Sequence, residues 1–152
     1  MARHSRNSPS EVTPGPEPNF LSPDFLSWDE VLEIHRQQIE RYGGSSGIRD
    51  PAGLESAIAT PQATFGGEFL HVTIPAMAAA YLFHVCQDHA FIDGNKRVGA
   101  NTAITFLRIN DWEPTFGNEE LVDVVLGVAS GRVSKGQLTE IFELRCRPGV
   151  LG

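Results

Sequence analysis

Hydrophobic positions recur along most of this chain at the three- and four-residue spacing of helices that bury one face. The first such stripe follows Ser27 and consists of Leu32, His35, Ile39 and Tyr42. Ser27 and Glu30 have the spacing of a capping box, in which each side chain bonds a free backbone amide of the other residue. The pattern is interrupted at residues 43 and 44, which are both glycine. We therefore predict a helix from about residue 28 to residue 42.

A second, shorter stripe follows Asp50 and Pro51. An acid that can cap a helix, followed by a proline suited to the first turn, predicts another helix start. Residues 60 to 72 then contain a proline, a Gly-Gly pair and two phenylalanines without helical period. We predict a flap or short hairpin in this segment.

Two longer stretches, residues 75 to 88 and 95 to 110, are apolar on nearly all sides and are predicted to be central helices of the core. Two amphipathic helices are predicted to begin near Asn118 and Ser134, the latter with Gln137 in a second capping box. The predicted fold is all-α, with about six helices and a short flap or hairpin before the central pair.

The length of 152 residues suits one domain with a core of its own. Five of the ten prolines lie in the first 23 residues, where almost nothing can be buried, so residues 1–24 are expected to form a disordered Pro-rich arm. The folded domain is expected to span residues 25–147, with a C-terminal tail at 148–152.

The formal net charge of −7 argues against direct DNA binding, because binding to phosphate backbones needs a surplus of cations on one face. Any basic site must therefore be local. Cys86 and Cys146 lack the spacing of a metal site and are expected to be reduced thiols. No stretch is long and apolar enough to span a membrane, and a cytoplasmic protein without membrane contact is predicted.

The loop between the two central helices has the sequence HAFIDGNKR, residues 89 to 97. If the second helix starts near residue 94, its free amides and its dipole favour an anion at that end. Gly94 lets the backbone approach an anion, and Asn95 offers a neutral donor. Lys96 and Arg97 add positive charge, the latter as a planar fork suited to phosphate. A phosphate-binding site is one prediction from this sequence.

The remaining polar residues extend that prediction. Asp93 would repel a phosphate unless Mg²⁺ lies between them, and His89 can accept a proton at cellular pH. Phe91 is predicted to turn inward and anchor the loop. The alternative is that Asp93 and Gly94 form an ordinary turn and that the following cations are a solvated helix start. The residues alone leave both interpretations open.

The loop resembles the core signature of the Fic/Doc superfamily, in which a histidine is followed by phenylalanine, an acid, a small residue, asparagine and arginine. The segments GGSSGIRDPAGLESAIATPQATFGGE before it and FIDGNKRVGANTAITFLRINDWEP around and after it resemble the Doc branch, so the likeness covers about residues 28 to 115. It implies an all-α fold of this superfamily and ATP-dependent transfer onto a protein hydroxyl.

The resemblance also implies roles for single residues. His89 matches the catalytic base, Asp93 the Mg²⁺-binding acid, and Arg97 a phosphate-binding cation. Gly94 and Asn95 match the anion hole. The flap residues Thr64, Phe65, Gly66 and Gly67 are expected to align the target, for example by pairing with its backbone as an added strand.

Lys96 separates the branches. Fic enzymes that transfer AMP typically have glycine at this position and a second arginine where this chain has Ala100, whereas Doc toxins carry the lysine. In one respect the chain departs from the Doc branch. The best-known Doc signature has alanine at the position of Gly94, whereas this chain has glycine, as Fic enzymes do. A lysine places a long cation where AMP-transferring enzymes leave space for phosphates.

The Doc resemblance implies a toxin of a toxin-antitoxin system. It would transfer the γ-phosphate of ATP, with Mg²⁺, to a threonine of translation elongation factor Tu and arrest translation. A Phd-like antitoxin is the implied partner. Three alternatives remain at this point: AMP transfer to a protein hydroxyl, an inactive Fic/Doc-fold binding protein, and a small helical regulator without a nucleotide site.

Overall fold

The computed structural model describes residues 22 to 149 of the chain. The helices are α1 (Trp28–Tyr42), α2 (Pro51–Ala59), the 3₁₀ turn η2 (Thr60–Gln62), α3 (Ile74–Asp88), α4 (Asn95–Ile109), α5 (Asn118–Ala129) and α6 (Lys135–Arg145). The strands are β1 (Thr64–Phe65), β2 (Glu68–Phe69), β3 (Trp112–Pro114) and β4 (Cys146–Pro148). The predicted all-α class with six α-helices is confirmed.

The helix ends follow local sequence signals. Ser27 and Glu30 form the predicted capping box of α1, and Ser134 and Gln137 form that of α6. Asp50 caps α2 by accepting a hydrogen bond from the amide of Gly53 at 2.9 Å. These contacts satisfy amides that have no partner inside the helix, and each is typically worth about 1 kcal/mol.

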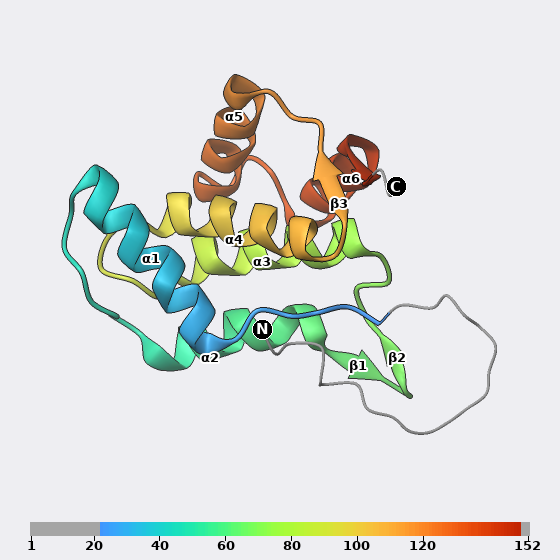
Figure 1. Ribbon diagram of the computed structural model, residues 1–152, viewed down its shortest axis with the longest axis horizontal. Coiled ribbons are helices and arrows are strands. Elements are labelled where there is room, and N and C mark those ends of the chain that lie inside the picture. The colour runs from blue at the N-terminus through green and yellow to red at the C-terminus, as the bar shows by residue number, and fades with distance from the viewer. Residues whose placement is uncertain (1–21, 150–152) are drawn as a thin grey trace.

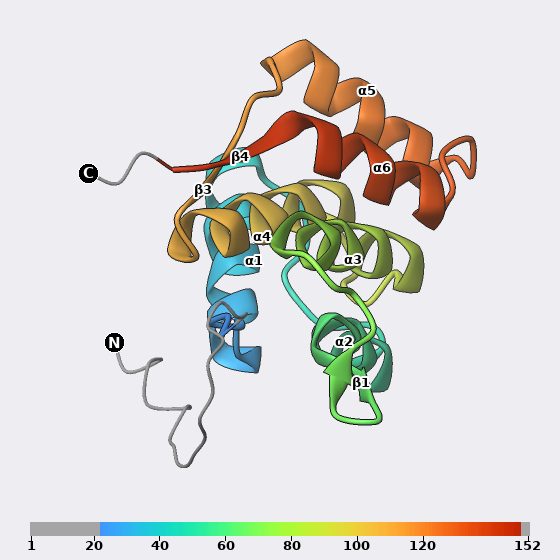
Figure 2. The same ribbon diagram turned by 90° about the vertical axis from the view of Figure 1, so that its right-hand side faces the viewer.

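The central pair, α3 and α4, lies side by side and antiparallel, and the other helices are arranged around it (Figure 1). Figure 2 shows α5 and α6 on one side of the pair and α2 on the other. Gly99 allows the two central helices to approach closely, because a Cβ there would lie only 3.0 Å from Sγ of Cys86 and 3.2 Å from the carbonyl oxygen of Leu82. The apolar stretches that predicted central helices thus form the middle of the core.

The N-terminal segment joins the core before the first helix begins. Leu26 is buried, and its amide donates to the hydroxyl of Tyr81 at 3.0 Å. The side chain of Asn110 bonds both the amide and the carbonyl of Asp24. The expected Pro-rich arm, residues 1–24, lies outside the described residues except for its last three. Among residues 22 to 149, no helix meets the length and apolarity needed to cross a bilayer.

Two small antiparallel strand pairs complete the fold. The predicted hairpin is formed by β1 and β2, with Thr64 opposite Phe69 and Phe65 opposite Glu68. The pair of β3 and β4 was not predicted, and it places Trp112 opposite Pro148. The expected tail at 148–152 therefore begins within a paired strand, and residues 150 to 152 lie outside the described part of the chain.

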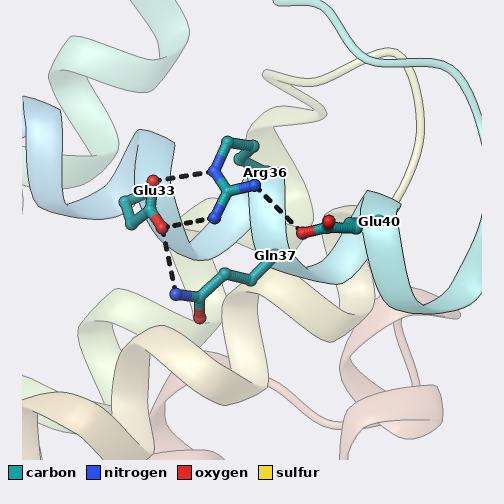
Figure 3. A network of polar contacts seen from close by, with 4 residues as sticks. All are labelled: Glu33, Arg36, Gln37 and Glu40. Atoms are coloured by element: carbon teal, nitrogen blue, oxygen red, sulfur yellow. Dashed lines mark hydrogen bonds and ion pairs between the residues drawn. The ribbon is translucent and has the colours of Figure 1, made fainter.

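The outer face of α1 carries a network of charged side chains (Figure 3). Arg36 bonds Glu33 at 2.7 Å and Glu40 at 3.0 Å, and Gln37 also donates to Glu33. Arg36 lowers the pKa of Glu33 to about 2, but exposed ion pairs of this kind contribute little stability. The opposite face of α1 carries His35 and Ile39, which lie against the loop between α3 and α4.

Two partly buried histidines, His71 and His84, give the fold a pH dependence. Burial, the nearby Lys135 and His84 lower the pKa of His71 from its usual 6.5 to about 4, and burial also lowers that of His84. As the pH falls from about 6.5 to about 4, His71 therefore becomes protonated in the unfolded chain before it does so in the folded chain. The free energy of unfolding should decrease across this range, by about 1 kcal/mol for half-buried His71, and should level off below it.

Urea unfolding at pH 7.5 and pH 5 measures this decrease. His71→Gln keeps a polar side chain of similar size without the titration, so the difference between the two pH values should shrink in that variant. An unchanged difference would show that His71 is not the source.

Candidate phosphate-binding site

The loop between α3 and α4, residues 89 to 94, is called the signature loop below. It begins at His89, whose left-handed backbone (φ 48°) ends α3 and whose side chain is exposed. It ends at Gly94, which has φ 86° and precedes the first residue of α4. A left-handed conformation is costly for residues other than glycine, and such strain is frequently found at functional sites.

Phe91 and Asn95 shape this loop from within. Phe91 is fully buried, which confirms the prediction that it turns inward, and it stacks on His35 with ring centroids 4.0 Å apart. The side chain of Asn95 accepts from the amide of Phe91 at 3.0 Å and donates to its carbonyl at 2.9 Å. Asn95 therefore closes the loop, and the role predicted for it as a donor to phosphate remains a prediction.

Asp93 is held by α1 and by the segment that follows it. Its backbone carbonyl accepts a bond from Nε2 of His35 at 3.0 Å, which requires the proton on that nitrogen. Its carboxylate accepts from the amide of Ser45 at 2.8 Å. The side chain is nevertheless exposed, and a carboxylate has more lone pairs than this one bond uses.

The segment from residue 44 to residue 50 runs along the start of the loop. The amides of Arg49 and Asp50 both donate to the carbonyl of Ala90, at 2.7 and 3.0 Å. Arg49 also donates through Nε to the carbonyl of His89 at 3.2 Å. These contacts hold the backbone that carries His89 in one place.

The start of α4 differs from the other helix starts in how its backbone amides are capped. Among the six α-helices within residues 22 to 149, it alone has neither a side-chain cap nor an acidic residue in its first turn. Its first amides therefore lack an intrahelical or side-chain partner, and the helix dipole adds partial positive charge.

A cavity of about 350 Å³ opens at this helix start. Its lining residues come from α4 with Gly94 and from α5: Gly94, Asn95, Lys96, Arg97, Ala100, Leu121, Val122, Val125 and Leu126. The wall contains two cations and no acid, in a chain with a net charge of −7. The polar end suits phosphates, and the apolar wall of α5 suits an uncharged part of the same ligand.

Cys86 lies beneath this site and is not a candidate nucleophile. Its thiol is buried, and burial raises its pKa to about 12 although Lys96 acts in the opposite direction. A thiol in this environment remains protonated at cellular pH and is unreactive.

The structure brings four of the predicted residues together, Gly94, Asn95, Lys96 and Arg97, in the wall of one cavity. His89 and Asp93 belong to the adjoining loop and do not line that cavity. The flap is elsewhere. Phe69 at its base contacts Phe25, and Phe25 stacks on Phe106 in the C-terminal half of α4.

The position of Phe106 places the flap toward the end of α4 that lies opposite to the cavity. Residues 95 and 106 of one helix are roughly 16 Å apart along its axis. Figure 1 shows the hairpin of β1 and β2 beyond the other end of the central pair from the signature loop. The flap residues Thr64, Phe65, Gly66 and Gly67 are exposed there, and the aligning role remains a prediction.

Three features of the site were not predicted from the sequence: the place of Tyr42, the place of Ser45, and the bond that His35 makes to Asp93. His35 was expected to pack in the core, and it is buried with only 5% of its surface exposed, but it also bonds the signature loop. Tyr42 lies under the guanidinium of Arg97. The only sequence signal for either residue is the hydrophobic stripe of α1, which does not indicate a role in binding.

Taken together, the fold and the site define a class: a helical domain in which a central antiparallel helix pair is joined by a short loop that ends at an uncapped helix start beside a cavity. The sequence model of the Fic/DOC family matches residues 25–107. The chain is 34% identical over 115 residues to "Protein kinase doc" of Escherichia phage P1, covering 76% of this chain and 90% of that protein. It is 42% identical over 69 residues to "Toxin Doc" of Mycolicibacterium smegmatis, covering 45% of this chain and 53% of that protein. The chain belongs to the Fic/DOC family.

Proposed function

We propose that this protein is a Doc-like toxin that transfers the γ-phosphate of ATP to a threonine hydroxyl of a translation factor, elongation factor Tu, in the cytoplasm. The observation that carries the proposal is the uncapped start of α4, with Lys96 and Arg97 in a cavity wall free of acids. The two relatives, one named as a protein kinase and the other as a toxin, support the same proposal.

His89 acts as the base in this proposal. It is exposed at the end of α3, within reach of solvent and of an approaching target, while Arg49 holds its backbone. It removes the proton of the target hydroxyl as that oxygen forms a bond to the γ-phosphorus. The bond from this phosphorus to the β–γ bridging oxygen breaks, and ADP leaves with those electrons.

The residues present also fit a magnesium ion, although no cluster of three potential metal-binding side chains occurs in residues 22 to 149. Mg²⁺ in nucleotide sites is commonly held by one or two carboxylates together with phosphate oxygens. Asp93 supplies one exposed carboxylate beside the cavity, fixed by Ser45. When bound, the ion would neutralise phosphate charge, and Asp93 would hold it.

Transfer of AMP is the second candidate, and Lys96 is the observation that disfavours it. Lys96 and Ala100 both line the cavity. Lys96 occupies space and adds a point charge where AMP-transferring Fic enzymes typically have glycine. Ala100 stands where those enzymes typically have a second arginine. The phosphates should therefore sit differently, with the terminal one toward the target.

The proposal includes two protein contacts. A Phd-like antitoxin is the expected inhibitor, as for a toxin of a toxin-antitoxin system. The flap is the proposed edge for the target backbone, with Phe65 80% exposed at the hairpin. A target segment paired with the flap would need at least about five extended residues to reach the cavity, because the two lie toward opposite ends of α4.

Transfer can be tested directly with labelled ATP. The purified protein and a translation extract are incubated with ATP labelled at either the α or the γ phosphate, with and without Mg²⁺. We expect one protein of the extract to gain label only from γ and only with Mg²⁺, and His89→Asn to give none. Label from α would establish AMP transfer instead. Absence of label from both would contradict the enzymatic proposal and leave a binding protein.

A further inference from the structure

Tyr42 and Arg97 form a stacked pair at the edge of the cavity. Tyr42 is the last residue of α1, and the guanidinium carbon of Arg97 lies 4.0 Å from the centroid of its ring. Within about 6 Å, a cation over an aromatic face is attracted by the negative charge of the ring. Arg97 is exposed and Tyr42 is 55% exposed, so neither side chain is held by burial alone.

The end of α1 is fixed relative to the signature loop, so the ring has a defined place. Gly43 ends the helix with φ 85°, and its amide donates to the carbonyl of Ile39 at 2.7 Å. A Cβ on Gly44 would lie 3.3 Å from Cβ of Asp93, which shows how closely the turn approaches the loop. His35, two turns earlier, bonds the carbonyl of Asp93. Tyr42 is therefore anchored to the same backbone that leads into α4.

We propose that Tyr42 is a positioning residue that holds the guanidinium of Arg97 toward the phosphates of the nucleotide. The inference rests on the proposed function, in which Arg97 binds phosphate. A free arginine side chain loses rotamer freedom when it binds, and stacking reduces that loss because the side chain is already ordered. The ring lies 4.0 Å from the guanidinium carbon on one side, and the N–H donors that point away from the ring remain available for phosphate oxygens.

The chain offers a matched control in Arg41. Its guanidinium lies 6.0 Å from the centroid of the same ring, at the outer limit of the interaction, and Arg41 does not line the cavity. Loss of Arg41 removes a charge from the same region without removing the stacked pair.

Affinity for Mg²⁺-ATP, measured by calorimetry on the full chain, tests the proposal. Tyr42→Leu should weaken binding by about threefold to tenfold, whereas Tyr42→Phe keeps the ring and should match the wild type. Arg41→Ala should also bind like the wild type. In an Arg97→Ala background, Tyr42→Leu should cause no further loss, because its effect acts through Arg97. In the labelling assay the same Tyr42→Leu change should raise KM and leave kcat nearly unchanged.

A second measurement tests the stacking without nucleotide. The ring current of Tyr42 should shift the Hε resonance of Arg97 upfield in the wild type and in Tyr42→Phe, and Tyr42→Leu should abolish the shift. Absence of the shift in the wild type, equal ATP affinity of wild type and Tyr42→Leu, or an additive loss in the double variant would each overturn the positioning role. If the wild type binds no ATP, the proposed function is overturned, and the role of Tyr42 toward phosphate is overturned with it.

Discussion

His89→Ala and His89→Asn are each expected to slow phosphate transfer by about a hundredfold to ten-thousandfold, the usual contribution of a positioned general base. The affinity for ATP should change little, because His89 does not line the cavity of Gly94, Asn95, Lys96 and Arg97. Transfer of γ label to a protein target and calorimetric binding of Mg²⁺-ATP measure the two effects separately. Growth arrest on expression in cells should be lost together with transfer.

The two variants differ in how they tolerate the backbone. His89 has φ 48°, a conformation that asparagine adopts readily and alanine does not. Asparagine thus removes the base and keeps the local conformation, and the comparison separates lost chemistry from strain. If His89→Asn retained wild-type transfer, the role of base would belong to another residue. If both variants also lost ATP binding, the role of His89 would be to maintain the structure of the binding site and not to remove a proton.

Phe91→Ala is expected to lower the free energy of unfolding by about 3 to 5 kcal/mol. Phe91 is fully buried and stacks on His35, so truncation leaves a cavity between α1 and the signature loop. Such a loss is a large part of the 5 to 15 kcal/mol that typically stabilises a domain. Urea unfolding measures the change, and ATP affinity should fall even under conditions where the variant is folded, since the loop leads directly into α4.

Ile92→Ala is the matched control for this prediction. The side chain is adjacent in sequence but 51% exposed, and its truncation should cost much less than that of Phe91. Equal losses from the two variants would contradict the anchoring role. Phe91→Leu should fall between Phe91→Ala and the wild type, because leucine fills part of the same space.

Some parts of this molecule could be predicted from local sequence because local contacts determine them. The capping boxes at Ser27 and Ser134 join residues three apart, and the two apolar stretches of the central helices indicate burial without reference to any partner. The helix starts and the all-α class followed from such signals. The strand pair of β3 and β4 could not be predicted, since each strand has three residues and their partners are more than 30 positions apart.

The sequence by itself determined where α4 begins and which charges stand at its start, and it carries the resemblance to the Fic/Doc signature. Only the tertiary structure decided how those residues are used. It bonded the carbonyl of Asp93 to His35 and its carboxylate to Ser45, and it placed Tyr42 under Arg97. The physical reason is distance along the chain. Asp93 and Arg97 receive these contacts from α1 and the turn after it, about fifty residues earlier, and no local pattern specifies which side chains will meet across that separation.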